Sequence, residues 1–108
     1  MSMSRSVIVR YRTRPEAADE NQRLAEAVYA ELAEKAPGGL QYATFRLADG
    51  VTFIHVAFHE GEGNPLAGVA AFEEFRSGIA DRCAEQPAPV EATLVGSYGL
   101  VTSAVVVG

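Results

Sequence analysis

The 108-residue sequence has no tryptophan, a single cysteine and two histidines. One cysteine, Cys83, excludes an intramolecular disulfide and fits a reducing cytoplasm. Basic residues are scarce, with 9 lysines and arginines against 14 aspartates and glutamates and a net charge of -5. This balance argues against a nucleic-acid partner and against an anionic membrane surface. No apolar run reaches the roughly 18 residues of a membrane span, so we expect a cytoplasmic domain without a nucleic-acid or membrane partner.

Sequence motifs for cofactors and nucleophiles are missing as well. The chain contains no GxGxxG, no P-loop and no serine nucleophile elbow. The two histidines, His55 and His59, fall four residues apart on one expected strand, which separates their backbones by roughly 13 Å. Ligating nitrogens lie about 2 Å from a zinc ion, so this pair cannot share one metal. We therefore predict no bound metal and no cofactor.

The first half of the chain has a strand pattern followed by a helix pattern. Residues 1–5 are expected to be disordered, and Ser6–Thr13 alternates with the two-residue period of a strand. A helix is expected over about residues 15–35, because Thr13 and Glu16 have the spacing of a capping box. Its apolar positions recur at helical spacing and comprise Ala17, Leu24, Val28 and Leu32.

The segments Leu40–Leu47 and Val51–His59 predict a β-hairpin. Asp49 and Gly50, which lie between them, are typical of a two-residue type I′ turn. This register fixes which residues share a face, because side chains alternate along a strand. It pairs Thr44 with His55, Tyr42 with Ala57 and Leu40 with His59, and it places Arg46 and Phe53 on that same face.

A second helix is expected to begin at Asn64 and Pro65 and to end before Pro87 and Pro89. Its apolar stripe comprises Leu66, Val69, Phe72, Phe75, Ile79 and Cys83. Val90–Tyr98 is expected to be the last strand, so the domain spans residues 6–98. Residues 99–108 form an apolar tail, a candidate for an added strand or for a segment exchanged between subunits.

The order βαββαβ predicts a ferredoxin-like α+β fold, with a four-stranded antiparallel sheet and two helices on one face. The other face of the sheet is also apolar, with Phe45 and Leu47 beside Ile54, Val56 and Phe58. A monomer rarely exposes so large an apolar patch. We therefore expect a homodimer that buries this open sheet face.

Three stretches carry a resemblance to a known family. They are VIVRYRTRPEAADE, APGGLQYATFR, and FIHVAFHE leading into AAFEEFR. Over roughly residues 6–98 the chain resembles the dimeric α/β-barrel superfamily, and in particular its antibiotic-biosynthesis-monooxygenase-like domains. The resemblance implies a dimeric α/β barrel. It also implies one of several roles, since such domains include cofactor-independent oxygenases of aromatic polyketides, haem-degrading enzymes and proteins of no assigned activity.

The haem-degrading members have a site that this chain lacks. The resemblance places Val9, His59 and Ile79 where those members have an asparagine, a tryptophan and a histidine. Haem degradation by that arrangement is therefore disfavoured. Stress-responsive proteins that share the fold are another family that the chain resembles.

The candidate catalytic residues are His55 and His59. A histidine with a pKa near 6.5 suits removal of a proton from a phenol or hydroquinone, and Tyr42 or Thr44 could orient it by a hydrogen bond. The alternative is that His55 is a buried, hydrogen-bonded core residue and His59 a half-exposed strand end. The candidate ligand pocket comprises Tyr11, Tyr42, Thr44, Phe53, Phe72 and Phe75, although aromatic residues at such spacing also form plain cores.

Three hypotheses for function follow from the sequence and the resemblance. The first is a cofactor-independent monooxygenase that acts on a small aromatic substrate of the phenol or quinol type. The second is a dimer that binds a small apolar or aromatic molecule without turnover. The third is a stress-related structural dimer with no ligand, which requires no cavity between helices and sheet.

Overall fold

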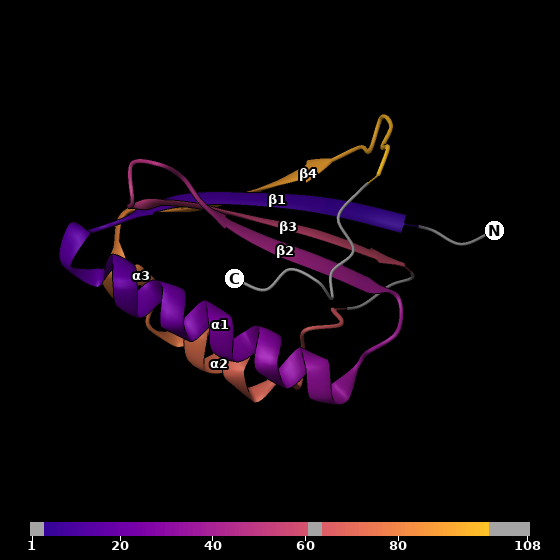
Figure 1. Ribbon diagram of the computed structural model, residues 1–108, viewed down its shortest axis with the longest axis horizontal. Coiled ribbons are helices and arrows are strands. Elements are labelled where there is room, and N and C mark those ends of the chain that lie inside the picture. The colour runs from indigo at the N-terminus through magenta and orange to yellow at the C-terminus, as the bar shows by residue number, and fades with distance from the viewer. Residues whose placement is uncertain (1–3, 61–63, 100–108) are drawn as a thin grey trace.

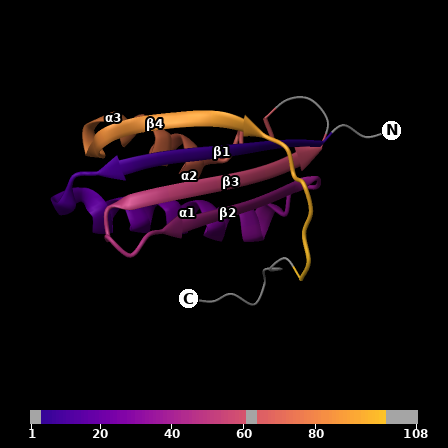
Figure 2. The same cartoon turned by 90° about the horizontal axis from the view of Figure 1, so that it is seen from above.

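The computed structural model describes residues 4–60 and 64–99. Its elements follow the order β1 (Ser4–Thr13), η1 (Pro15–Ala17), α1 (Ala18–Lys35), β2 (Leu40–Arg46), β3 (Thr52–Glu60), α2 (Ala70–Ser77), α3 (Ile79–Arg82) and β4 (Cys83–Ala92). The four strands form one antiparallel sheet in the order β2-β3-β1-β4. The helices pack against one face of this sheet (Figure 1), and Figure 2, seen from above, shows the strands lying over the helices. The predicted ferredoxin-like α+β architecture is confirmed.

The start of β1 and the start of the first helical segment each differ from the prediction. β1 begins at Ser4, because Ser4 and Arg5 pair with the end of β3. The expected disorder of residues 1–5 is therefore wrong for these two residues, and residues 1–3 lie outside the described part of the chain. The capping box is also absent: the helical segment opens with a 3-10 turn whose N-cap is Arg14, without a side-chain cap hydrogen bond.

The hairpin has the predicted register and a different turn. Thr44 pairs with His55, as the alternation of side chains required. The turn is not of type I′, because only Gly50 of its residues has a positive φ, +79°. Instead, the Asp49 carboxylate accepts hydrogen bonds from the backbone N–H groups of Val51 and Thr52, both at 2.9 Å. A wider loop thus preserves the same pairing.

The second helix begins later than expected and is divided in two. Asn64 closes a turn, its Oδ1 accepting from the Leu66 N–H at 3.0 Å. The chain then passes through Gly68, which has a φ of +88° that an L side chain rarely adopts. α2 starts at Ala70, where the Glu31 carboxylate of α1 accepts from the first two N–H groups of the helix. The α1–α2 contact therefore supplies the cap that the sequence did not reveal.

The last strand runs from Cys83 to Ala92, so the prediction of Val90–Tyr98 is wrong. Pro87 and Pro89 were interpreted as helix terminators, but they lie within β4. β4 is an edge strand, and there a missing proline N–H leaves no partner in the sheet unsatisfied. The pairing with β1 is irregular between Arg10 and Thr13, consistent with a bulge at this edge. Of the predicted tail 99–108, only Gly99 is among the described residues.

The two faces of the sheet have different surroundings. The core lies between the sheet and α1 and α2, with Tyr11, Val28 and Phe53 almost fully buried. On the open face, Phe45 is 54% exposed and Val90 is 59% exposed. This face is the apolar one that the hairpin register predicted. Among the described residues, no helix is long and apolar enough to cross a membrane.

Candidate functional site

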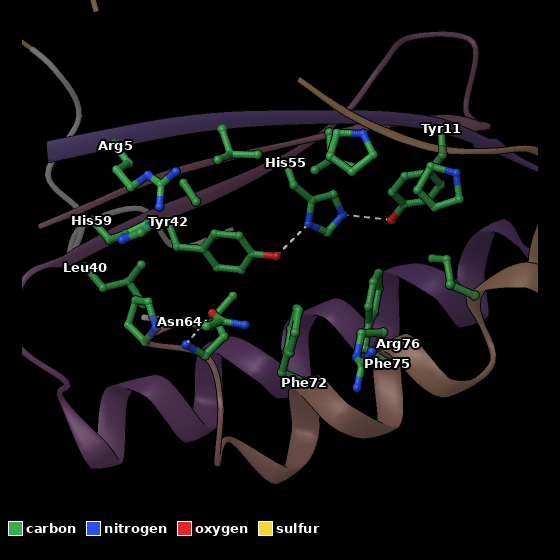
Figure 3. A pocket seen from close by; sticks show the side chains of 18 residues that line it. Arg5, Tyr11, Leu40, Tyr42, His55, His59, Asn64, Phe72, Phe75 and Arg76 are labelled. Carbon is green, nitrogen blue, oxygen red and sulfur yellow. Dashed lines mark hydrogen bonds between the residues drawn. The ribbon is translucent and has the colours of Figure 1, made fainter. Parts of the chain in front are cut away.

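A cavity of about 510 Å³ lies between the sheet and the α2–α3 segment. Its wall is mostly apolar, and Phe72 and Phe75 from α2 face the strands across it (Figure 3). Arg5 and His59 are at one end, and Tyr11 is at the other. A volume of this size is in the range of small-molecule sites, which are concave and mainly apolar with a few polar groups.

Six of the eight residues proposed from the sequence line this cavity. They are Tyr11, Tyr42, His55, His59, Phe72 and Phe75. The other two, Thr44 and Phe53, do not line it. Phe53 lies behind Tyr11, with its ring stacked at a centroid distance of 5.6 Å, and Thr44 is hydrogen-bonded to the hydroxyl of Tyr29 at 2.7 Å. These two residues support the wall and do not contact the interior of the cavity.

His55 occupies the centre of the polar part of the site. Its side chain points from β3 toward the helices, and the residue is only 6% exposed. The Nε2 atom lies 2.8 Å from the hydroxyl of Tyr11 on β1, and Nδ1 lies 2.8 Å from the hydroxyl of Tyr42 on β2. Thr44 Oγ1 is a more distant neighbour of Nδ1 at 3.3 Å. The contact of Tyr42 and Thr44 with this histidine, expected from the strand register, is present.

Burial lowers the pKa of His55 from 6.5 to about 4, because the charged imidazolium loses hydration. The same effect acts in the opposite direction on the tyrosines. Burial raises the pKa of Tyr29 to about 12, and it raises the pKa values of Tyr11 and Tyr42 as well. At neutral pH the site therefore holds a neutral imidazole between protonated phenols.

Two residues that the sequence analysis did not select extend this arrangement into the core. Asn21 of α1 is fully buried and Arg82 of α3 is 7% exposed. Arg82 Nε donates to Asn21 Oδ1 at 2.9 Å, and Asn21 Nδ2 donates to the Tyr11 hydroxyl at 2.8 Å. Together with His55 and Tyr42 these residues form one continuous series, called here the buried hydrogen-bond chain.

Arg82 is a buried cation held by neutral groups. Its guanidinium donates to the carbonyl of Phe75 at 2.8 Å and lies 5.0 Å from the centroid of the Phe75 ring. None of the ion pairs among the described residues includes it. The sequence contains a signal for Asn21 and Arg82 in their positions on the apolar stripes of the two expected helices. Asn21 falls four residues after Ala17, and Arg82 falls three residues after Ile79. A polar residue on an apolar stripe indicates a buried polar contact.

His59 lies apart from this chain of hydrogen bonds. It lines the cavity near Leu40, with which it pairs across β2 and β3. Its Nδ1 atom is buried and has no hydrogen-bond partner among the described residues. Within residues 4–60 and 64–99, no group of three or more histidine, cysteine, aspartate or glutamate side chains is arranged to hold a metal ion.

Comparisons with known proteins bear on the fold. No protein-family model matches the chain, and no curated protein matches its sequence. A candidate antibiotic biosynthesis monooxygenase from Bacteroides thetaiotaomicron superposes with a TM-score of 0.73 at 13% identity, covering 93% of this chain and 96% of that one. One from Nitrosomonas europaea has a TM-score of 0.70 at 14% identity, covering 88% and 93%.

A variant of SnoaB, a cofactor-independent oxygenase from Streptomyces nogalater, is also similar. Its TM-score is 0.62 at 12% identity, and the match covers 87% of this chain and 95% of that one. Because the identities are low, these similarities establish the fold and not the activity. The chain has the ferredoxin-like fold of antibiotic-biosynthesis-monooxygenase-like proteins, as the sequence resemblance implied.

Proposed function

We propose that the protein is a cofactor-independent monooxygenase that acts on a small aromatic substrate of the phenol or quinol type. The observation that carries this proposal is the apolar cavity of about 510 Å³ with Tyr42 and His55 in its wall. Aromatic rings at Phe72 and Phe75 offer stacking surfaces for an aromatic ligand. The structural similarity to SnoaB adds support from the fold.

Such a reaction needs no redox group in the protein, because the substrate supplies all the electrons. A deprotonated anthrone, for example, passes an electron to dioxygen, and recombination forms a carbon–oxygen bond. The methylene carbon becomes a carbonyl, and its two hydrogens leave with the second oxygen atom as water. The protein has to bind the ring, exclude water and stabilise the anionic oxygen, for which hydrogen-bond donors in a poorly hydrated site are effective.

The test is oxygen consumption with an anthrone and with a hydroquinone, measured with an oxygen electrode. We expect uptake above the spontaneous rate, falling about 100-fold in Tyr42→Phe because one donor is lost. His55→Ala should also fall sharply, and His59→Ala measures the share of the second histidine. Tyr29→Phe is the matched control, since it removes a partly buried hydroxyl from a residue that does not line the cavity. If both histidine variants keep full activity, histidine has no part in the mechanism.

Non-catalytic binding of a small aromatic molecule is the second candidate. It is favoured by one specific observation: both ring nitrogens of His55 already have protein partners at 2.8 Å, so no free basic nitrogen of that ring faces the cavity. Such a protein would be stabilised by its ligand without turnover. A rise in the melting temperature with naphthalene-type compounds, together with no oxygen uptake, would select this reading. The cavity itself disfavours the ligand-free structural alternative.

We propose that the active unit is a homodimer joined through the open sheet face. Ile8, Phe45, Leu47 and Val90 are all more than a third exposed there, at 38%, 54%, 37% and 59%. Ile8 pairs with Val90 and with Val56, and Val56 pairs with Ala43, two residues before Phe45, so these side chains belong to one face. Leu47 follows directly after the end of β2. A second copy of the same face would remove this apolar surface from water. Sedimentation as a monomer at micromolar concentration would exclude the proposal.

A further inference from the structure

We propose that Arg82 and Asn21 are positioning residues that set the direction of the buried hydrogen-bond chain, so that Tyr42 presents its hydroxyl proton to the cavity. The cavity then selects an aromatic ligand that carries a hydrogen-bond acceptor, a carbonyl or phenolate oxygen, at that point. The proposal deepens the proposed function by naming the ligand group, and it rests on that function only for the use made of the donated proton.

The donor-to-acceptor order of the buried hydrogen-bond chain is fixed first at Arg82, because a guanidinium has only donors and no acceptor. Its Nε lies 2.9 Å from the side-chain amide of Asn21, so the amide atom that faces it has to be the oxygen. The amide nitrogen is thereby directed to the other side, where the Tyr11 hydroxyl lies at 2.8 Å. Arg82 thus fixes the orientation of an amide whose two ends are otherwise alike in shape.

Tyr11 determines which nitrogen of His55 acts as the hydrogen-bond acceptor. Its oxygen accepts from Asn21, and its own proton has one further partner, the Nε2 atom of His55 at 2.8 Å. Nε2 therefore accepts, and the proton of the neutral imidazole is on Nδ1. The opposite tautomer would leave the Tyr11 proton without an acceptor in a residue that is 2% exposed, and an unsatisfied buried donor is costly.

Tyr42 is the last member of the chain. The Nδ1–H of His55 donates to its oxygen at 2.8 Å. Among the described residues, the Tyr42 hydroxyl has no second hydrogen-bond partner, and its side chain lines the cavity. Figure 3 shows the hydroxyl between His55 and the rings of α2. The Tyr42 proton is therefore left for a ligand, and a ligand oxygen that accepts satisfies it.

Asn21→Asp is the variant that reverses the direction. A carboxylate still accepts from Arg82, and it can only accept from Tyr11. The Tyr11 proton then turns toward residue 21, His55 donates through Nε2, and Tyr42 donates to Nδ1 and not to the ligand. The change is nearly isosteric, and the new charge lies against the buried guanidinium, so the fold should persist.

The first readout is the tautomer of His55 in ligand-free protein, from ¹⁵N–¹H correlation spectra of the imidazole ring. We expect the proton on Nδ1 in the native protein and on Nε2 in Asn21→Asp. Asn64→Asp adds the same charge to the cavity wall at a residue outside the buried hydrogen-bond chain, and it should leave the tautomer unchanged. A proton on Nε2 in the native protein overturns the proposal, whether or not the variant folds. An unchanged tautomer in folded Asn21→Asp overturns it as well.

The second readout is ligand preference, measured by anaerobic calorimetric titration with 1-tetralone and 1-naphthol. These bicyclic probes are similar in size, but the ketone only accepts, whereas the naphthol also donates. We expect the ratio of their affinities to shift toward 1-naphthol by about five- to tenfold in Asn21→Asp, as loss of one hydrogen bond implies. An unchanged ratio refutes the ligand assignment. No turnover is involved, so absence of oxygen uptake alone would refute only the proposed oxygenase function.

Discussion

Acidification should destabilise the folded protein through His55. In the unfolded chain this imidazole takes up a proton near its ordinary pKa of 6.5, whereas in the folded state burial lowers its pKa to about 4. Between these values the unfolded state binds more protons than the folded state. The contribution of His55 is therefore complete above about pH 6.5 and is lost as the pH falls toward 4.

The magnitude follows from the difference between the two pKa values. One unit corresponds to about 1.4 kcal/mol, and acidification from about pH 7 to about pH 4.5 crosses most of the interval between 6.5 and 4. The expected loss in the free energy of unfolding is roughly 2 kcal/mol from this one group. For a small domain whose total stability is of the order of 5–15 kcal/mol, such a loss is readily measured.

The assay is urea unfolding at both pH values for the native protein and for His55→Gln. Other titrating groups contribute to both proteins, so the difference between their two pH-dependent changes isolates His55. The control is Val28→Ala, which is destabilised by a core cavity but keeps the imidazole and should keep the native pH dependence. A His55→Gln protein that loses as much stability on acidification as the native protein would refute the assignment of a buried, neutral imidazole.

Three further changes test the core, the hairpin and the open face. Phe53→Ala, at a residue that is 1% exposed, should cost about 3–5 kcal/mol in urea unfolding; a smaller loss would show that the Tyr11 stack closes the gap. Asp49→Ala should lower the urea midpoint, because the N–H groups of Val51 and Thr52 lose their acceptor. Phe45→Lys should sediment as a monomer where the native protein sediments as a dimer, since it charges the open face.

The parts of the fold that the sequence predicted are those specified by local periodicity. Alternation along β2 and β3 permits one register, since a slip by one residue would move Phe53 and His55 to the open face. The register therefore survives even though the turn is wider than predicted. β4 was misplaced because Pro87 and Pro89 stop a helix and also suit an edge strand. Whether these prolines end a helix or lie in an edge strand depends on the position of the strand in the sheet, and the local sequence pattern does not specify that position.

The candidate site likewise contains residues that the local pattern could place and residues that it could not. Tyr42 and Thr44 could be placed beside His55 because all three lie on paired strands whose register the sequence defines. Asn21 and Arg82 could not be placed, because their contact depends on how α1 and α3 cross the sheet and each other. Long-range helix packing brings together residues 61 positions apart, and no local spacing encodes that distance.

The contacts made by Asn21 and Arg82 change which residue is the candidate for direct contact with the ligand. From the sequence, His55 was a candidate base, because a histidine near the middle of the pH range is the usual proton acceptor. In the structure its two nitrogens bridge Tyr11 and Tyr42, and burial holds the ring neutral with a pKa of about 4. A base needs a free lone pair within reach of the substrate, and this ring offers none. We infer that His55 instead transmits the donor–acceptor order set by Arg82, and that Tyr42 is the group that contacts the ligand.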